Sequence, residues 1–271
     1  VVNGGTNDVV IYFGFGDGSF LKGRSFSTGD NSSPDAMIIG DFNHDFRLDI
    51  IVANYRSNNI VVFLGKDDEP FGSILTFRTG IGSQPHSIAI GECNNDGQMD
   101  IIVASYGTNN IAILLGDSHM LFKTMLIHST GIRSSPYSLA VADMNNDKNL
   151  DIAVTNSQSN TVMILFGIGN GSFIEGMIYS TGDQSRPYQI VLHDMNNDHL
   201  LDLIIANSGT SNILIIYGLG NGTFGNTNQY NLGYGYEPYS IAVSDINNDG
   251  RMDIAVACYA TDHVEILLGP C

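Results

Sequence analysis

The sequence predicts an all-β fold of the β-propeller class, and three observations lead to this prediction. An acidic decapeptide such as "DMNNDKNLDI" (143–152) occurs five times, and its starts at 41, 92, 143, 194 and 245 define a repeat of 51 residues. Each repeat contains four short segments of strand character separated by turn residues, and no longer segment of helical period. Four antiparallel strands repeated every ~40–50 residues are typical of propeller blades, whose closure into a ring removes free sheet edges.

The repeat covering 136–182 shows the four expected strands in order. "PYSLAVADM" is the first, "LDIAVTN" the second, "TVMILFG" the third and "GMIYSTG" the fourth. Their apolar residues alternate or run continuously, as in half-buried and fully buried strands. A parallel β-solenoid is the structural alternative, but its repeats are usually shorter. The repeats start near the prolines that recur at the same interval, which are Pro34, Pro85, Pro136, Pro187 and Pro238.

The two ends of the chain bear on the number of blades. Residues 1–14 align with 52–65, so the chain begins inside a blade at its second strand, and it ends at Cys271 just after a third strand. Residues 24–29 could supply the missing fourth strand of the last blade and close the ring. We therefore expect one domain over 1–271 with five blades, in which 1–33 is a partial blade. The alternative is six blades, one of them incomplete or split.

Composition narrows the function classes. Acidic residues number 28 against 11 Lys and Arg, and the formal net charge of −17 argues against nucleic acid and favours cations or basic partners. Hydrophobic residues make up 43% of the chain, yet no run of about 18 apolar residues occurs, so we expect no membrane insertion. The odd and dispersed cysteines Cys93, Cys258 and Cys271 define no disulfide framework and allow one pair at most.

The acidic decapeptide has the chemistry of a cation-binding loop. Positions 1, 3 and 5 carry oxygen side chains that a tight loop can bring to one centre, position 7 can offer its backbone carbonyl, and the Asp at position 9 can complete the shell. Without a cation, the three carboxylates of one loop would repel one another. The alternative interpretation is that Asp and Asn only form Asx turns, but five copies at fixed spacing favour a metal.

Calcium suits this donor set best. It takes six to eight oxygen ligands in irregular geometry, whereas magnesium demands a stricter octahedron, and the lack of His or Cys at these positions argues against zinc and copper. Five calcium ions would bring the formal net charge from −17 to −7. A pair of carboxylates can also serve a glycosidase, but a catalytic pair is needed only once. Glu92 is the one departure at position 1, and its longer side chain could weaken that site.

Glycine-rich turns accompany the acidic loops at "FGFGDGSF" (13–20), "FGIGNGSF" (166–173) and "YGLGNGTFG" (217–225). Together the two motifs resemble the FG-GAP and VCBS repeats of integrin α-subunit propellers and of many extracellular proteins. The resemblance implies a β-propeller with calcium in the loop between the first and second strands, on the face opposite the usual ligand side, and a role in adhesion or recognition. It also implies an extracellular location, secreted or at the cell surface. The stretches "LGKDDEPFG" and "LGDSHMLF" lack the glycine pattern, and integrin propellers have seven longer blades, so integrin ligands do not carry over.

The family's calcium ligands carry over to the matching positions of the five loops, with up to one ion per repeat. Positions 1, 3, 5 and 9 would bind through side chains and position 7 through its carbonyl. These residues are Asp41, Asn43, Asp45, Arg47 and Asp49; Glu92, Asn94, Asp96, Gln98 and Asp100; Asp143, Asn145, Asp147, Asn149 and Asp151; Asp194, Asn196, Asp198, Leu200 and Asp202; and Asp245, Asn247, Asp249, Arg251 and Asp253.

A candidate ligand site lies on the opposite face of the propeller. The residues just after the repeated prolines should stand at the mouth of the central channel, where aromatic rings with neighbouring amides suit sugars or peptides. They are Asp35, His86, Tyr137, Tyr188 and Tyr239. The alternative is that these tyrosines only pack between blades.

The function expected from the sequence is a calcium-stabilised, lectin-like or adhesive recognition module for a protein or glycan. No Ser, His and Asp grouping recurs, so we expect no catalysis by this chain. A second hypothesis is a non-catalytic scaffold or carbohydrate-binding part of a polysaccharide-processing enzyme, and a third is a purely structural repeat. The oligomeric state is left open.

Overall fold

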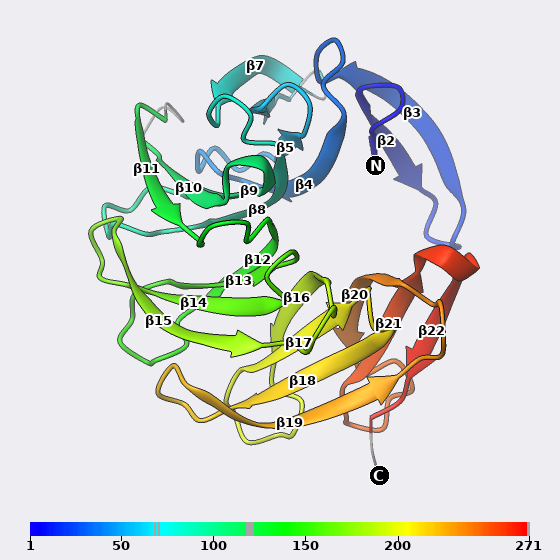
Figure 1. The fold of residues 1–271 in the computed structure, drawn as a ribbon. Coiled ribbons are helices and arrows are strands. Elements are labelled where there is room, and N and C mark those ends of the chain that lie inside the picture. The colour runs from blue at the N-terminus through cyan, green and yellow to red at the C-terminus, as the bar shows by residue number, and fades with distance from the viewer. Residues whose placement is uncertain (68, 70, 118–121, 270–271) are drawn as a thin grey trace.

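The computed structural model describes residues 1–67, 69, 71–117 and 122–269. Within them, six antiparallel sheets follow one another in chain order around a central axis (Figure 1). The first sheet contains β1 (Val2–Asn3), β2 (Asp8–Gly14) and β3 (Phe20–Ser27), and the last contains β20 (Pro238–Ser244), β21 (Asp253–Cys258) and β22 (His263–Leu267). The prediction of an all-β propeller is confirmed.

The four sheets between them have four strands each, as the repeat predicts. They are β4 (Pro34–Gly40), β5 (Asp49–Asn54), β6 (Asn59–Gly65) and β7 (Phe71–Arg78); β8 (Pro85–Gly91), β9 (Asp100–Ser105), β10 (Asn110–Leu115) and β11 (Thr124–Ser129); β12 (Pro136–Ala142), β13 (Asp151–Asn156), β14 (Thr161–Gly167) and β15 (Phe173–Ser180); and β16 (Pro187–His193), β17 (Asp202–Asn207), β18 (Asn212–Gly218) and β19 (Phe224–Asn231). Two short 3₁₀ turns, Tyr106–Thr108 and Tyr259–Thr261, precede β10 and β22.

The expectation of five blades is wrong, because residues 1–33 form a sheet of their own. β3 pairs with β2 from Asp8↔Ser27 to Gly14↔Phe20, and in the described part of the chain no pairing joins β3 to β22. The reason is local: a short turn connects β2 to β3, so their hairpin costs less loop-closure entropy than a pairing with the far end of the chain. The structure thus has six blades, with three strands in the first and three in the last.

The hydrophobic core lies between the blades. Both faces of the second and third strands of a blade are covered by its neighbours, so Ile51 and Ile60 of the second blade pack with Ile101 and Leu114 of the third. Equivalent clusters join each of the remaining pairs of blades that are consecutive in the chain. This arrangement explains why segments such as "DIIVAN" are continuously apolar between their first and last residues: a strand that is buried on both faces has no solvent side.

The last blade shows what this packing contributes. Val264 in β22 is 63% exposed, whereas the residues at the same repeat position in other blades, Ile60, Ile111, Val162 and Ile213, are fully buried. Among the described residues, no buried cluster joins the last blade to the first, so this face of β22 lacks the apolar cover that a following blade gives elsewhere. The burial of a third strand therefore depends on the next blade and not on its own sequence.

Two described cysteines, Cys93 and Cys258, are free and buried in different inter-blade clusters. They therefore act as small apolar core residues. Cys271, the third candidate for a disulfide, lies outside the described residues. Where the chain is described, none of its helices is both long and apolar enough to span a membrane.

His128 in β11 predicts a measurable pH dependence. Its Nε2 accepts a hydrogen bond from the backbone N–H of Phe173 at 3.3 Å, and burial lowers the pKa of the imidazole, against a smaller opposing effect of Glu175. Below about pH 6.5, the ordinary pKa of His, the unfolded chain therefore binds a proton that the folded chain resists, and stability falls as the pH falls.

The change to test is His128→Tyr, because Tyr179 occupies the same repeat position in the next blade and its hydroxyl accepts the N–H of Phe224. Melting temperatures between pH 7.5 and 5 should show a smaller loss on acidification for the variant than for the wild type. Equal losses would mean that His128 makes no contribution to the pH dependence.

Candidate functional site

The five acidic loops share one conformation and lie between the first and second strands of their blades. In the loop from Asp143, Oδ1 and Oδ2 of Asp143 accept the N–H groups of Asp147 and Lys148 at 3.1 and 2.8 Å, and Asn145 Oδ1 also accepts the N–H of Asp147. Asp147 Oδ1 accepts the N–H of Asn149. Positions 1, 3 and 5 therefore turn their oxygens toward the inside of the loop, as the motif predicts.

Positions 4 and 6 of each loop adopt left-handed backbone angles. Position 6 is Gly97 or Gly250 in two loops, but Phe46, Lys148 and His199 hold the same conformation at φ between 66° and 71° in the other three. A non-glycine residue there costs about 1–2 kcal/mol. Three loops keep the conformation in spite of that cost, so the hydrogen bonds around it must offset the strain.

The second loop differs at position 1, where the sequence predicted a departure. Glu92 reaches the position-6 N–H of Gly97 with its longer side chain, and its other oxygen accepts the N–H of Asn94 at 3.2 Å. The position-5 N–H of Asp96 is then bonded by Asn94 Oδ1. The loop shape is kept, but its first carboxylate is placed differently from the other four.

The aspartates at position 9 have a role that the sequence did not reveal. Each of Asp49, Asp100, Asp151, Asp202 and Asp253 is fully buried. In the fourth blade, Asp151 Oδ2 accepts the N–H of Met144 at 2.8 Å and Oδ1 accepts the N–H of Gly167 at 3.0 Å. The carboxylate thus ties the acidic loop to the end of the third strand, and the same two bonds recur in the other four blades.

This tie also explains the glycine that recurs at the end of the third strand. A Cβ at Gly167 or Gly218 would lie 2.2 Å from the carbonyl oxygen of Leu150 or Leu201, just before the buried aspartate. Only glycine lets the strand approach closely enough for its N–H to reach the carboxylate. These glycines recur every 51 residues, at Gly65, Gly116, Gly167, Gly218 and Gly269, and the structure supplies the physical reason.

Burial raises the pKa of the position-9 carboxyls, although the hydrogen bonds that each accepts from two backbone N–H groups lower it. This holds for Asp49, Asp100, Asp151 and Asp202. The neighbouring loop carboxylates raise these pKa values further. A buried acid with acidic neighbours is stabilised in its charged form by a cation.

Two of the three glycine-rich turns, 166–173 and 217–225, contact the acidic loop of the preceding blade. Gly171 donates its N–H to the carbonyl of Cys93 at 2.8 Å, and Gly222 does the same to Met144 at 2.9 Å. In addition, the Asn146 side chain donates to the carbonyl of Gly220 at 3.0 Å. At these two junctions between blades, the acidic loop and the glycine-rich turn are therefore joined by hydrogen bonds on one face of the propeller.

The donor set of the loops fits an oxygen-seeking cation such as calcium, because carboxylate and amide oxygens retain lone pairs beyond those that accept the N–H groups. Two features argue that binding needs adjustment of the side chains. Among the described residues, no group of three or more His, Cys, Asp or Glu side chains already converges as a metal site. In the first loop, Arg47 Nε lies 3.7 Å from Asp45 Oδ2 and Nη1 lies 3.4 Å from Asp67 Oδ2, so an arginine already neutralises part of the charge.

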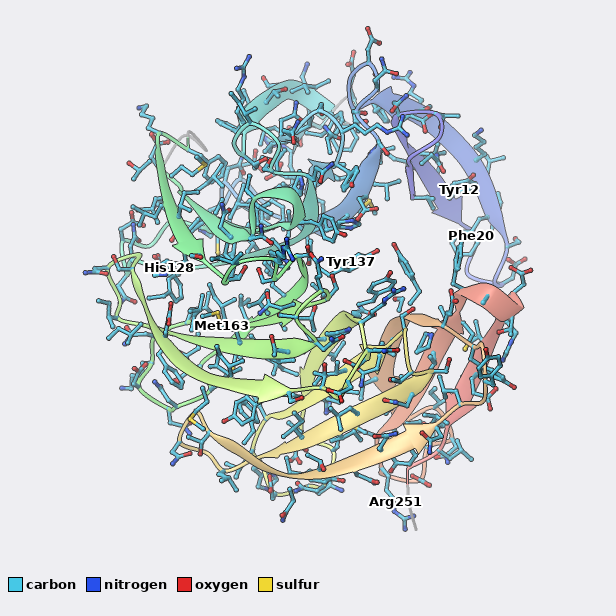
Figure 2. All side chains as sticks on the ribbon, in the orientation of Figure 1. Tyr12, Phe20, His128, Tyr137, Met163 and Arg251 are labelled. Atoms are coloured by element: carbon cyan, nitrogen blue, oxygen red, sulfur yellow. The ribbon has the colours of Figure 1, made fainter. Side chains whose placement is uncertain are left out.

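The structure brings the five residues after the prolines together at the centre of the ring, where Figure 2 labels Tyr137. Each stands at an irregularity in the register between the first and second strands, as between Pro136 and Ser138. Such bulges re-aim a side chain out of the regular alternation. The sequence predicted this convergence correctly but did not reveal the bulges.

The cluster at the channel mouth is a stack of rings. Tyr137 lies between His86 and Tyr188, with ring centroids 4.1 and 4.3 Å away, and its hydroxyl is 2.5 Å from that of Tyr239. Nδ1 of His86 is 2.5 Å from Oδ2 of Asp35. Burial raises the pKa of Tyr137 far above its ordinary value and also raises that of Tyr239, so both phenols stay protonated.

Both faces of the Tyr137 ring are covered, whereas Tyr239 remains 40% exposed and the neighbouring Tyr259 73%. The tyrosines therefore pack on one another across the channel and not only between blades. Tyr137 is a structural element of the stack, and Tyr188, Tyr239 and Tyr259 are the rings that remain able to contact a ligand.

These observations define a class of protein: a β-propeller in which five of the six blades carry an acidic loop on one face, and loops surround the channel mouth on the other face. A family model described as FG-GAP-like repeat matches residues 41–103, 92–154, 143–205 and 194–256. The chain belongs to the FG-GAP repeat family, as the resemblance of its motifs implied.

Solved structures show the same fold at low sequence identity. Virginiamycin B lyase from Staphylococcus aureus matches with a TM-score of 0.65 and 14% identity, over 96% of this chain and 76% of that one. A periplasmic gluconolactonase from Pseudomonas aeruginosa matches with a TM-score of 0.65 and 13% identity, over 93% and 78%. A protein from Lactobacillus plantarum matches with a TM-score of 0.68 and 12% identity, over 97% and 78%. Among curated proteins, none matches the chain in sequence.

Proposed function

We propose that this propeller is an extracellular recognition module, secreted or displayed at a cell surface, that binds a protein or glycan through the face opposite its acidic loops. The observation that carries the proposal is the convergence of Asp35, His86, Tyr137, Tyr188 and Tyr239 at one channel mouth. Exposed tyrosine rings beside polar groups supply contact area at low entropic cost and suit sugars and peptides.

Calcium is the second part of the proposal, with up to one ion per acidic loop. The side chains at positions 1, 3, 5 and 9 and the carbonyl at position 7 would hold it, as the family resemblance implies. The bound ion would neutralise the loop carboxylates and fix the acidic loops against the glycine-rich turns.

The binding proposal is tested on arrays of glycans and of extracellular proteins, with affinities then measured for any ligand found. Tyr239→Ala should weaken binding, and it should also lower the melting temperature, since it removes the partner of the Tyr137 hydroxyl at 2.5 Å. Phe46→Ala is the matched control, because Phe46 is 97% exposed in an acidic loop on the opposite face. The proposal fails if all ligand interactions survive both Tyr239→Ala and Tyr188→Ala.

A second candidate function is a scaffold or carbohydrate-binding part of a polysaccharide-processing enzyme. The pair formed by Asp35 and His86 favours it, because a carboxylate beside an imidazole can support proton transfer. Incubation with anionic polysaccharides, followed by assays for new reducing ends and for unsaturated products, tests this candidate. Product formation that is lost in His86→Gln would place catalysis in this chain, and binding without turnover would favour a non-catalytic part.

A further inference from the structure

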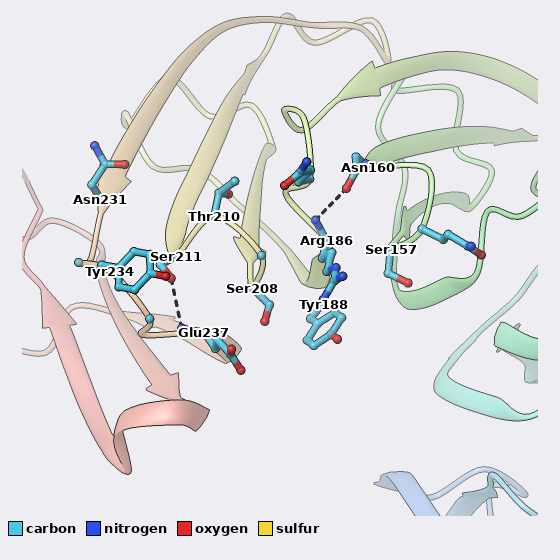
Figure 3. Close-up of a pocket in the computed structure, with 15 residues that line it drawn as sticks. Ser157, Asn160, Arg186, Tyr188, Ser208, Thr210, Ser211, Asn231, Tyr234 and Glu237 are labelled. Carbon is cyan, nitrogen blue, oxygen red and sulfur yellow. Dashed lines mark hydrogen bonds between the residues drawn. The ribbon is translucent and has the colours of Figure 1, made fainter.

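A cavity of about 1030 Å³ lies beside the channel mouth, on the same face (Figure 3). Loops of the fourth, fifth and last blades surround it, and its lining includes Asn160, Arg186, Tyr188, Thr210, Tyr234 and Glu237. Tyr188 belongs both to this cavity and to the ring stack. The volume is at the upper end of the ~300–1,000 Å³ that ligand pockets usually have, so it can take more than one sugar ring.

The lining is rich in groups that both donate and accept hydrogen bonds. Ser, Thr, Asn and Gln side chains predominate, and the two charged residues have opposite signs. Arg186 and Glu237 occupy the same position in consecutive repeats, 51 residues apart, and both are left-handed with φ of 46°. Within the described part of the chain neither side chain forms an ion pair. The guanidinium of Arg186 and the carboxylate of Glu237 therefore remain available to a ligand.

One wall of the cavity departs from the repeat. In four repeats, a Thr hydroxyl and a Ser hydroxyl pair within the loop before the first strand, at 2.6–2.7 Å, as between Thr181 and Ser185. The loop 231–237 has Leu232 and Tyr236 at these two positions instead. Tyr236 packs edge-on against His263, with ring centroids 5.0 Å apart.

Glycines accommodate this change in the loop. Gly233 and Gly235 have φ of 128° and 79°, and a Cβ at Gly233 would lie 2.8 Å from the ring of Tyr236. Between these glycines the side chain of Tyr234 is fully exposed to solvent, and it lies at the edge of the cavity (Figure 3). Folding gains nothing from an aromatic ring that buries no surface, whereas a ligand can stack on it.

We propose that this cavity binds a neutral oligosaccharide, an inference that rests on the recognition function proposed above. The hydroxyl and amide groups of the lining match sugar hydroxyls, and Tyr188 and Tyr234 offer aromatic surfaces for the apolar faces of sugar rings. Because the charges of Arg186 and Glu237 cancel and the whole chain carries −17, a polyanionic glycan is repelled where a neutral one is not.

The experiment uses the whole chain in calcium-containing buffer on an array of neutral oligosaccharides of hexose and N-acetylhexosamine units, with uronic-acid oligosaccharides and peptides on the same slides. Binding of neutral oligosaccharides is expected, and titration calorimetry should show affinity about five- to tenfold weaker for Tyr234→Ala. Glu237→Gln, which keeps size and one acceptor, should weaken binding less. Ile132→Ala is the matched control: Ile132 holds the same position in the loop before β12, is 95% exposed and does not line the cavity.

The outcomes separate this inference from the proposed function. Neutral glycan binding that is lost in Tyr239→Ala but unchanged in Tyr234→Ala and Glu237→Gln would locate the binding site at the channel mouth. This result would overturn the cavity inference and leave the proposed recognition function standing. Preferential binding of uronic-acid oligosaccharides or of peptides would also overturn the inference while supporting recognition by this face. No ligand among glycans, peptides or extracellular proteins would overturn both.

Discussion

Replacing Asp151 with alanine should lower the free energy of unfolding by roughly 2–6 kcal/mol, since it leaves two buried N–H groups without an acceptor at about 1–3 kcal/mol each. The donors are Met144 and Gly167, at 2.8 and 3.0 Å from the carboxylate, and Asp151 has no exposed surface. Urea unfolding of the calcium-free protein measures the loss. Asp151→Asn should retain part of the stability, because its single amide oxygen can serve only one of the donors.

The matched control is Asp147→Ala in the same loop. Asp147 is exposed and accepts hydrogen bonds from Asn149 and Asn145, so its loss should cost little in calcium-free solution. If calcium binds as proposed, Asp147→Ala becomes strongly destabilising only when calcium is present, whereas Asp151→Ala is destabilising in both conditions. A loss for Asp151→Ala that disappears in calcium-free buffer would refute the structural role of this carboxylate.

Removal of calcium should lower the melting temperature by a large amount. A ligand that binds only the folded state at one hundred times its Kd contributes about 2.7 kcal/mol per site, and the acidic loop occurs five times. Metal analysis should approach five calcium ions per chain, and treatment with EGTA should lower the melting temperature until calcium, and not magnesium, is restored. The loop with Glu92 should bind most weakly, because its first carboxylate is placed differently.

Asp147→Ala provides the stoichiometric control, with an expected loss of one ion per chain. An absence of bound metal together with an unchanged melt would mean that the five loops are Asx turns held by their own hydrogen bonds. The proposed extracellular, calcium-dependent role would then lose its chemical basis, while the propeller fold and the family membership would stand.

The repeat made most of the fold predictable from the sequence. A period of 51 residues with four apolar segments specifies blades, because a strand pattern with turn residues at fixed places leaves few other ways to bury its apolar faces. The prolines predicted the starts of β4, β8, β12, β16 and β20, and the residues following them were expected at the channel mouth, where the structure brings them together. Local patterns and periodicity were sufficient for these predictions.

The number of blades was decided only by the tertiary structure. The motif count favoured pairing residues 24–29 with the last blade, but the choice lies between two strand pairings of similar chemistry, and the local hairpin with β2 is entropically cheaper. The buried hydrogen bonds that Asp151 and its equivalents accept could not be predicted either. A sequence does not reveal which of the three carboxylates of a loop is desolvated.

The sequence by itself thus determined the repeat, the strand pattern, the oxygen-rich loops and the family. Only the three-dimensional arrangement determined which repeats form the cavity. Arg186 and Tyr188 reach it from one loop region, and Tyr234 and Glu237 reach it from the next. Periodicity reports what all blades share, because every blade must bury the same faces. A binding site depends on side chains at one junction between blades, and their proximity follows from the packing of consecutive blades around the axis.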